Sequence, residues 1–176
     1  MLRNSILPLA AATTICLGAL GAHANPPTYA NPQLRTTAVQ LRDAVEHQRA
    51  LGWFDATTPI RVVDVRSAKA FAAGHLPGAI NLPTNELADP MAHVPGALKS
   101  DRRIAQLLGL LGINSRTAVV IYDDKGGFHA ARLFWLLEYY GHRKVSLLDG
   151  GIQAWKAAGF RLIGSRSQAP HRKAVF

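Results

Sequence analysis

Cysteine is nearly absent from this sequence: Cys16 is the only one among 176 residues. A single thiol cannot form a disulfide within the chain, and it cannot supply the several thiolates of a Cys-based zinc or iron–sulfur site. Aromatic residues (7%) and charged residues (18%) are also few, whereas hydrophobic residues make up 48%. This composition argues against a largely disordered chain, and together with the length it predicts one folded domain with a substantial core.

Acidic residues are scarce relative to basic ones, 11 against 20, which gives a formal net charge of +9. Part of this excess lies in a basic C-terminal tail, residues 161–176, which contains four basic residues and no acid. A basic tail can contact anionic partners. It lacks, however, the interleaved aromatic residues and the motif spacing typical of nucleic-acid-binding domains. We therefore expect a solvated extension and no nucleic-acid partner.

The first 24 residues have the order of a secretory signal peptide. Arg3 gives a positive start, an apolar stretch follows over residues 6–20, and Ala22 and Ala24 place small residues before a cleavage point. A membrane anchor is the alternative, but about fifteen residues fall short of the roughly 20 that a spanning helix needs. We predict cleavage after Ala24, export to the periplasm or the medium, and no stable membrane anchor. Cleavage would also remove Cys16.

Beyond this leader, β-branched runs alternate with amphipathic stretches. We predict an extended leader over 25–36 and a single α/β domain over 37–160, with a central parallel sheet and helices on both faces. The most continuous strand is Ala118–Tyr122, an apolar run expected where both faces of a sheet are covered. Spacing, caps and glycines predict helices at 38–50, 67–71, 100–111 and 152–158, and one more helix that follows the loop after Tyr122 and ends at residue 140. The predicted strands are 60–65, 79–82, 118–122 and 144–148.

The loop after Tyr122 is the candidate site, because ligands bind at the carboxyl ends of parallel strands. Glycines let backbone N–H groups converge there, and the following helix adds the positive end of its dipole. The spacing matches neither a P-loop nor a dinucleotide-binding turn, and no histidine spacing suggests a metal site, so we expect neither cofactor nor metal. The candidate residues for binding an anion are Asp124, Lys125, Gly126, Gly127, His129, Arg132 and, from an earlier strand end, Arg66.

Three ordered motifs carry a family resemblance. They are VVDVR at 62–66 with FAAGHLPGAINL at 71–82, then VVIYD at 119–123, and finally LLDGGIQAW at 147–155. Together they resemble the signatures of rhodanese-like domains over roughly residues 37–159. The resemblance implies a doubly wound domain around a parallel sheet. It also implies sulfurtransferase chemistry, in which a cysteine persulfide carries sulfur from thiosulfate or a similar donor to an acceptor.

The sequence departs from active members of that family at one decisive position. In active members a cysteine follows the strand that ends here at Tyr122, and its loop surrounds the sulfur with backbone N–H groups. Asp123 stands at this position, and a carboxylate has no persulfide chemistry. With Asp124 beside it, it should also repel anions. The pattern resembles the first, non-catalytic half of two-domain thiosulfate sulfurtransferases, with residues 170–176 similar to their connector.

Two functions of different classes follow from this departure. The first is an exported, non-catalytic module with no catalytic residue of its own, which binds or supports a partner protein or a small anion such as thiosulfate. The alternative is a component of a thiosulfate sulfurtransferase whose persulfide cysteine comes from a second rhodanese domain or from a partner chain.

Individual side chains also have structural interpretations. Arg66 could attract an anionic substrate, but we expect it to form an ion pair or to anchor the neighbouring loop. We expect His75 to fix a turn by hydrogen bonding. Arg132 is expected to pair with Asp123 or Asp124. Trp135 is expected in the core, and Asp149 as a helix cap.

Overall fold

The computed structural model describes residues 32–50 and 59–164. Five strands form one sheet in the order β1-β5-β4-β2-β3, and every neighbouring pair is parallel. The predicted α/β fold with a central parallel sheet is therefore confirmed. The strands are β1 (Arg35–Thr36), β2 (Ile60–Asp64), β3 (Ala79–Asn81), β4 (Ala118–Tyr122) and β5 (Val145–Leu148).

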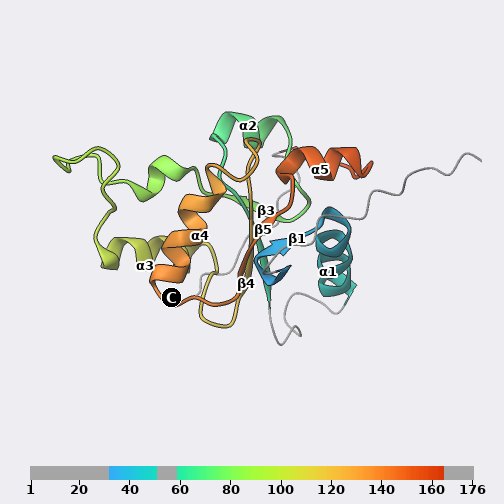
Figure 1. Cartoon of the computed structure of the whole chain (residues 1–176), viewed down its shortest axis with the longest axis horizontal. Helices are drawn as coiled ribbons and strands as arrows, with labels where there is room; N and C mark the ends of the chain where they lie inside the picture. The colour runs from blue at the N-terminus through green and yellow to red at the C-terminus, as the bar shows by residue number, and fades with distance from the viewer. Residues whose placement is uncertain (1–31, 51–58, 165–176) are drawn as a thin grey trace, which may run out of the picture.

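Helices cover both faces of the sheet, as Figure 1 shows. On one face α1, α2 and α5 bury a cluster that includes Leu41, Phe71 and Trp155. On the other face α3 and α4 bury a second cluster that includes Leu108 and Leu136. The helices are α1 (Ala38–Ala50), α2 (Ala68–Ala73), α3 (Asp101–Leu110), α4 (Ala130–Tyr139) and α5 (Gly151–Ala157), with 3₁₀ turns η1 (Pro32–Leu34) and η2 (Thr84–Leu87).

Local sequence signals explain where the first helices begin. Before α1, the Thr37 hydroxyl accepts a hydrogen bond from the Gln40 N–H, and the Gln40 side chain accepts one in return from the Thr37 N–H. This reciprocal capping box fixes the start of a helix whose bounds match the prediction. Ser67 caps α2 with a single bond, because its hydroxyl accepts a hydrogen bond from the Ala70 N–H.

Strand β1 and the residues around Asp149 differ from the sequence prediction. Residues 35 and 36, predicted as part of an extended leader, pair with β5 at the edge of the sheet. Asp149 forms an ion pair with Arg35, and Gly150 occupies the N-cap position of α5 without a side-chain bond. The prediction that Asp149 caps the helix was therefore wrong, because its carboxylate is drawn to the guanidinium of the neighbouring strand.

Most of the predicted terminal segments lie outside the described residues: the leader 1–24, residues 25–31 and residues 165–176. The described start of the basic tail packs on the domain, where His75 and Ile163 exchange backbone hydrogen bonds of 2.9 Å. Over 32–50 and 59–164, no helix combines the length and the hydropathy that a bilayer crossing requires.

An arm, residues 88–98, extends from the body between η2 and α3 and forms the far end of the molecule in Figure 1. A bridge between Ala88 and Leu98 closes its base. Arg132, on the first turn of α4, donates a hydrogen bond of 2.5 Å to the carbonyl of Gly96. The arm is therefore tied to the start of α4.

His142, just beyond α4, makes stability dependent on pH. Only 5% of this residue is exposed, and burial lowers the pKa of its imidazole although backbone hydrogen bonds at Thr117 and Lys144 raise it. With a folded pKa below the unfolded value of about 6.5, the unfolded state binds more protons in acid. Stability from this group is therefore complete above the unfolded pKa and is lost as the pH falls toward the folded pKa.

We expect the unfolding free energy to drop between about pH 7 and about pH 5, and to drop less in His142→Gln. Urea titrations at the two pH values measure the difference. The exposed His47 supplies the control, since His47→Gln should leave the drop unchanged. An equal drop in wild type and His142→Gln would contradict this assignment.

Candidate functional site

Asp123, directly after β4, fills the loop that follows it with its own carboxylate. The residue is fully buried. One carboxylate oxygen, Oδ1, accepts hydrogen bonds of 2.9 Å from the N–H groups of Lys125 and Gly127. The other, Oδ2, accepts bonds of 2.7 Å and 3.0 Å from the N–H groups of His129 and Ala130. The predicted cradle of converging N–H groups is present, and its anion is part of the chain.

The electrostatics of this arrangement favour the ionised carboxylate. Burial raises the pKa of Asp123, but the four backbone hydrogen bonds outweigh it, and the pKa lies below its ordinary value. The first turn of α4 supplies two of the donors, so the helix dipole adds to their effect. From the sequence, the Asp123 carboxylate was expected to repel a ligand anion. In the structure this carboxylate itself occupies the position that a ligand anion would take.

The backbone of Asp123 is held as tightly as its side chain. Its carbonyl accepts a hydrogen bond of 3.0 Å from the N–H of Ile152 in α5. Gly151 has a φ of +56°, and a Cβ there would lie 2.4 Å from the Asp123 carbonyl oxygen. Glycine is required at this position by close approach as well as by backbone conformation.

Asp64 and Arg66 form a second buried group at the carboxyl edge of the sheet. The register places Asp64 beside Tyr122. Arg66 donates to Asp64 Oδ2 from Nη2 at 2.6 Å and to Asp64 Oδ1 from Nε at 2.9 Å, and Nη2 also reaches the Gly74 carbonyl at 2.8 Å. Burial raises the pKa of Tyr122, whose hydroxyl accepts a hydrogen bond from the Leu76 N–H. The guanidinium of Arg66 is thus engaged as the structural interpretation predicted.

Three of the other predicted site residues, Lys125, Gly127 and His129, form the cradle with their backbone N–H groups, and no side-chain hydrogen bond to the Asp123 carboxylate is seen among the described residues. Asp124, Lys125 and Gly126 are exposed on the loop, and Gly127 and His129 are half-buried and contribute their N–H groups. Arg132 does not pair with Asp123 or Asp124, because it bonds to Gly96 of the arm. The expectation of an Arg132–aspartate pair was wrong, since the Asp123 carboxylate already accepts four backbone hydrogen bonds.

The structure confirms the prediction for His75 and contradicts the prediction for Trp135. His75 is buried, donates from Nδ1 to the Phe71 carbonyl at 2.9 Å and stacks on the Phe71 ring, which confirms its role in a turn. Trp135 is 57% exposed on α4, so its prediction as a core residue was wrong. The four-residue step from Trp135 to Tyr139 places both rings on one face of the helix, but it does not show whether that face is buried or exposed.

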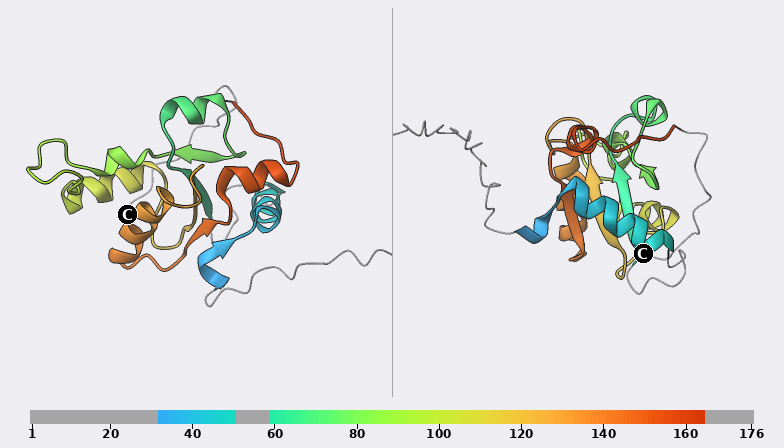
Figure 2. Two further views of the ribbon diagram at one scale, coloured as in Figure 1. Left: turned by 45° about the horizontal axis from the view of Figure 1, so that its top comes forward. Right: turned by 90° about the vertical axis from the view of Figure 1, so that its right-hand side faces the viewer.

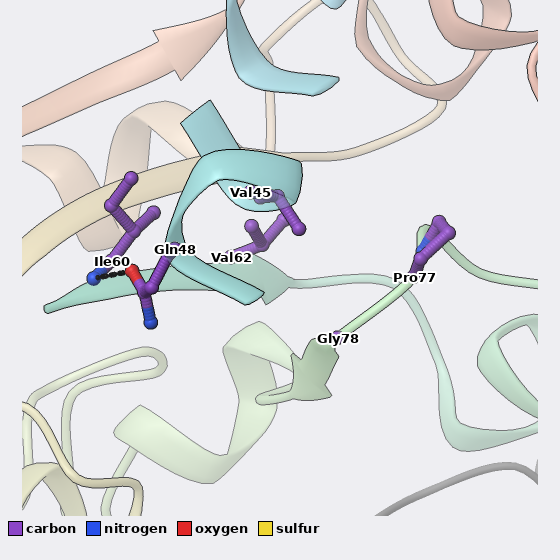
Figure 3. Close-up of a pocket in the computed structure, with 6 residues that line it drawn as sticks. All are labelled: Val45, Gln48, Ile60, Val62, Pro77 and Gly78. Carbon is purple, nitrogen blue, oxygen red and sulfur yellow. Dashed lines mark hydrogen bonds between the residues drawn. The ribbon is translucent and has the colours of Figure 1, made fainter. Parts of the chain in front are cut away.

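A shallow pocket lies apart from the Asp123 cradle, between the end of α1, the start of β2 and the turn at residues 77 and 78 (Figure 3). Its lining is mostly apolar, and Gln48 contributes its polar groups. The Gln48 side chain accepts a hydrogen bond of 2.6 Å from the Ile60 N–H. None of the predicted site residues lines this pocket. Within the described ranges, no group of three or more His, Cys, Asp or Glu side chains is placed to hold a metal ion.

The comparisons with known proteins agree with the fold and with the motifs around this cradle. The profile of the rhodanese-like domain matches residues 40–158. The chain belongs to the rhodanese-like domain family. Among curated relatives of this rhodanese-like domain, human 3-mercaptopyruvate sulfurtransferase is 31% identical over 147 residues, which is 79% of this chain and 50% of the human protein. Thiosulfate sulfurtransferase of Pseudomonas aeruginosa is 39% identical over 98 residues, which is 54% of this chain and 35% of that protein.

A solved structure has the same architecture. SseA from Escherichia coli, a 3-mercaptopyruvate sulfotransferase, superposes with a TM-score of 0.66 at 25% identity, over 81% of this chain and 55% of that chain. The rhodanese-like domain therefore spans about half the length, or less, of the curated relatives named above.

Proposed function

We propose that this rhodanese-like domain is a non-catalytic module that binds or supports a partner protein and transfers no sulfur by itself. The single observation that carries the proposal is the position of the Asp123 carboxylate. It accepts four backbone hydrogen bonds in the loop where the active members that the sequence resembles hold a cysteine sulfur.

The chemistry of the replacement supports this proposal. Sulfur transfer from thiosulfate requires a thiolate that attacks the outer sulfur, releases sulfite and carries the sulfur as a persulfide to the acceptor. A carboxylate oxygen forms no stable bond of this kind. The four N–H groups are also already engaged, so an external anion such as thiosulfate would have only the side chains around the loop to bind it. We therefore favour a protein partner over thiosulfate as the ligand.

Thiocyanate formation from thiosulfate and cyanide tests the proposal. We expect the purified domain to produce thiocyanate no faster than a protein-free blank, while the Pseudomonas aeruginosa thiosulfate sulfurtransferase serves as the positive control. Turnover clearly above the blank would overturn the proposal. The uncleaved full chain and its Cys16→Ser variant belong in the same assay, because any turnover that the substitution abolishes would come from Cys16, the only thiol in the sequence.

The alternative function has support from the lengths of the relatives. Because the domain matches half or less of these sulfurtransferases, its natural setting can include a second rhodanese-like domain or a partner chain that brings the persulfide cysteine. In that case, adding this domain should raise the turnover of the cysteine-bearing partner. In either setting we propose an exported protein, cleaved after Ala24.

A further inference from the structure

Helix α4 carries an aromatic face that points away from the sheet. On the helix, Trp135 and Tyr139 are 57% and 67% exposed and Ala131 is exposed as well; Phe128, in the turn just before the helix, is 76% exposed. We call Phe128, Ala131, Trp135 and Tyr139 the α4 face. The opposite side of the helix packs in the core, so the orientation of the face is fixed by the fold. Figures 1 and 2 show α4 on the side of the sheet opposite α1.

We propose that two copies of this chain associate through the α4 face, as an antiparallel pair of α4 helices centred on Trp135. This inference goes beyond the proposed function, because it does not depend on the chemistry at Asp123.

The aromatic rings are arranged for binding before any partner arrives. The rings of Trp135 and Tyr139 stack with their centroids 5.3 Å apart and an angle of 19° between their planes. Tyr140 packs edge-on against Tyr139, and its hydroxyl donates a hydrogen bond of 2.7 Å to Asp101 in α3. The Trp135 and Tyr139 rings are thus nearly parallel, and Tyr140 restrains the Tyr139 ring. Association therefore costs little side-chain entropy.

The area of the face matches the core of a dimer interface. An aromatic side chain buries about 150–250 Å² when fully covered, so the exposed fractions of the three rings leave roughly 400 Å² of aromatic surface. A standard interface buries about 800 Å² on each partner, with an apolar core and a polar rim. The α4 face alone supplies about half of this area. The arm, which Arg132 ties to the start of α4 through Gly96, also carries the exposed Met91 (85%) and Val94 (67%) close to Gly96 in sequence.

The sequence of the face is self-complementary. Ala131 and Tyr139 stand four residues on either side of Trp135. When two helices pair antiparallel about Trp135, the small Ala131 of one copy lies level with the large Tyr139 of the other. Large side chains then have small ones to pack beside on both sides of the twofold axis, which is the requirement for an isologous interface.

The centre of the face carries no net charge, so it offers no electrostatic attraction to an anionic partner. Arg132 and Glu138 stand three residues on either side of Trp135, so the centre of the face is electrically neutral. The whole chain has a net charge of +9, and two copies therefore repel at long range. Added salt screens this repulsion and leaves the apolar contact intact. Association should accordingly strengthen with salt, which is opposite to the behaviour of a complex held by ion pairs.

Sedimentation velocity on the purified protein, expressed from the full sequence, tests the proposal over about 1–100 μM. We expect a dimer whose population rises with concentration and with salt. Trp135→Glu places a charge at the twofold axis and should raise the dissociation constant at least tenfold. The exposed position makes this variant compatible with folding, which circular dichroism verifies.

Val39→Glu is the matched control, because Val39 is 49% exposed on α1, across the sheet from α4. This variant should dimerise like the wild type. A monomeric wild type over the whole concentration range would overturn the proposal. A dimer that Trp135→Glu and Val39→Glu weaken equally, or not at all, would overturn it as well.

Discussion

Replacing Asp123 with alanine is expected to lower the unfolding free energy by about 3–5 kcal/mol, the largest effect of any single substitution proposed for this domain. The substitution removes an acceptor of four backbone hydrogen bonds and leaves their donors unsatisfied. Ala130 is buried, so loss of the carboxylate leaves its N–H without an acceptor in the core. Urea denaturation near neutral pH measures the change.

The adjacent aspartate supplies the control for this experiment. Asp124 is exposed, and Asp124→Ala should change the unfolding free energy by no more than about 0.5 kcal/mol. If the Asp123→Ala variant does not fold, Asp123→Asn keeps the size of the side chain and still presents an amide nitrogen to N–H donors. Equal stability of the wild type and both Asp123 variants would show that the cradle does not depend on the carboxylate.

The pH dependence of the same comparison has a definite sign. Because the folded pKa of Asp123 is lowered, its stabilisation is complete above the unfolded pKa of about 3.9 and is lost as the pH falls through the folded pKa. The difference between wild type and Asp123→Asn should therefore narrow below about pH 4.

Gly151→Ala is expected to lower the unfolding free energy by about 3 kcal/mol or more. The positive φ of +56° is unfavourable for alanine, and the added Cβ would meet the Asp123 carbonyl oxygen at 2.4 Å. Backbone on both sides would have to shift, and the hydrogen bond from Ile152 to Asp123 would be disturbed. Thermal and urea unfolding both report this loss.

Gly126→Ala separates the two contributions to that effect. Gly126 has a φ of +65°, but a Cβ there would meet no atom within 4 Å. Its substitution should therefore show only the conformational cost, about 1 kcal/mol. If both variants were destabilised equally, the close approach of Gly151 to Asp123 would have no energetic weight.

The helices and strands of the interior were predictable because their signals are local. α1 matches its prediction since Thr37 and Gln40 cap it within the sequence, and β4 matches since a continuous apolar run is typical of a strand covered on both faces. β1 was not predictable, because two residues carry no periodicity. Its place depends on β5, on the Thr36–Ser146 hydrogen bond and on the Arg35–Asp149 ion pair, all more than 100 residues distant.

The position of the converging N–H groups was predictable, but the group that accepts their hydrogen bonds was not. The sequence placed converging N–H groups after Tyr122 because glycines and a helix start follow a buried strand. It did not show that the Asp123 side chain turns back into its own loop, since that depends on rotamer and loop conformation. The predictions for Arg132 and Trp135 were wrong for a related reason, because both depend on tertiary packing. The arm supplies the acceptor for Arg132, and the packing of α4 on the sheet leaves Trp135 exposed.

One consequence of the double hold on Asp123 concerns motion. Its side chain binds the loop and the first turn of α4, and its carbonyl binds the start of α5. Local opening of the loop therefore releases amides in three segments at once, and these segments should exchange their hydrogens as one cooperative unit. Loops that open for a ligand have a low free energy of local opening, whereas opening this loop breaks hydrogen bonds to two helices as well.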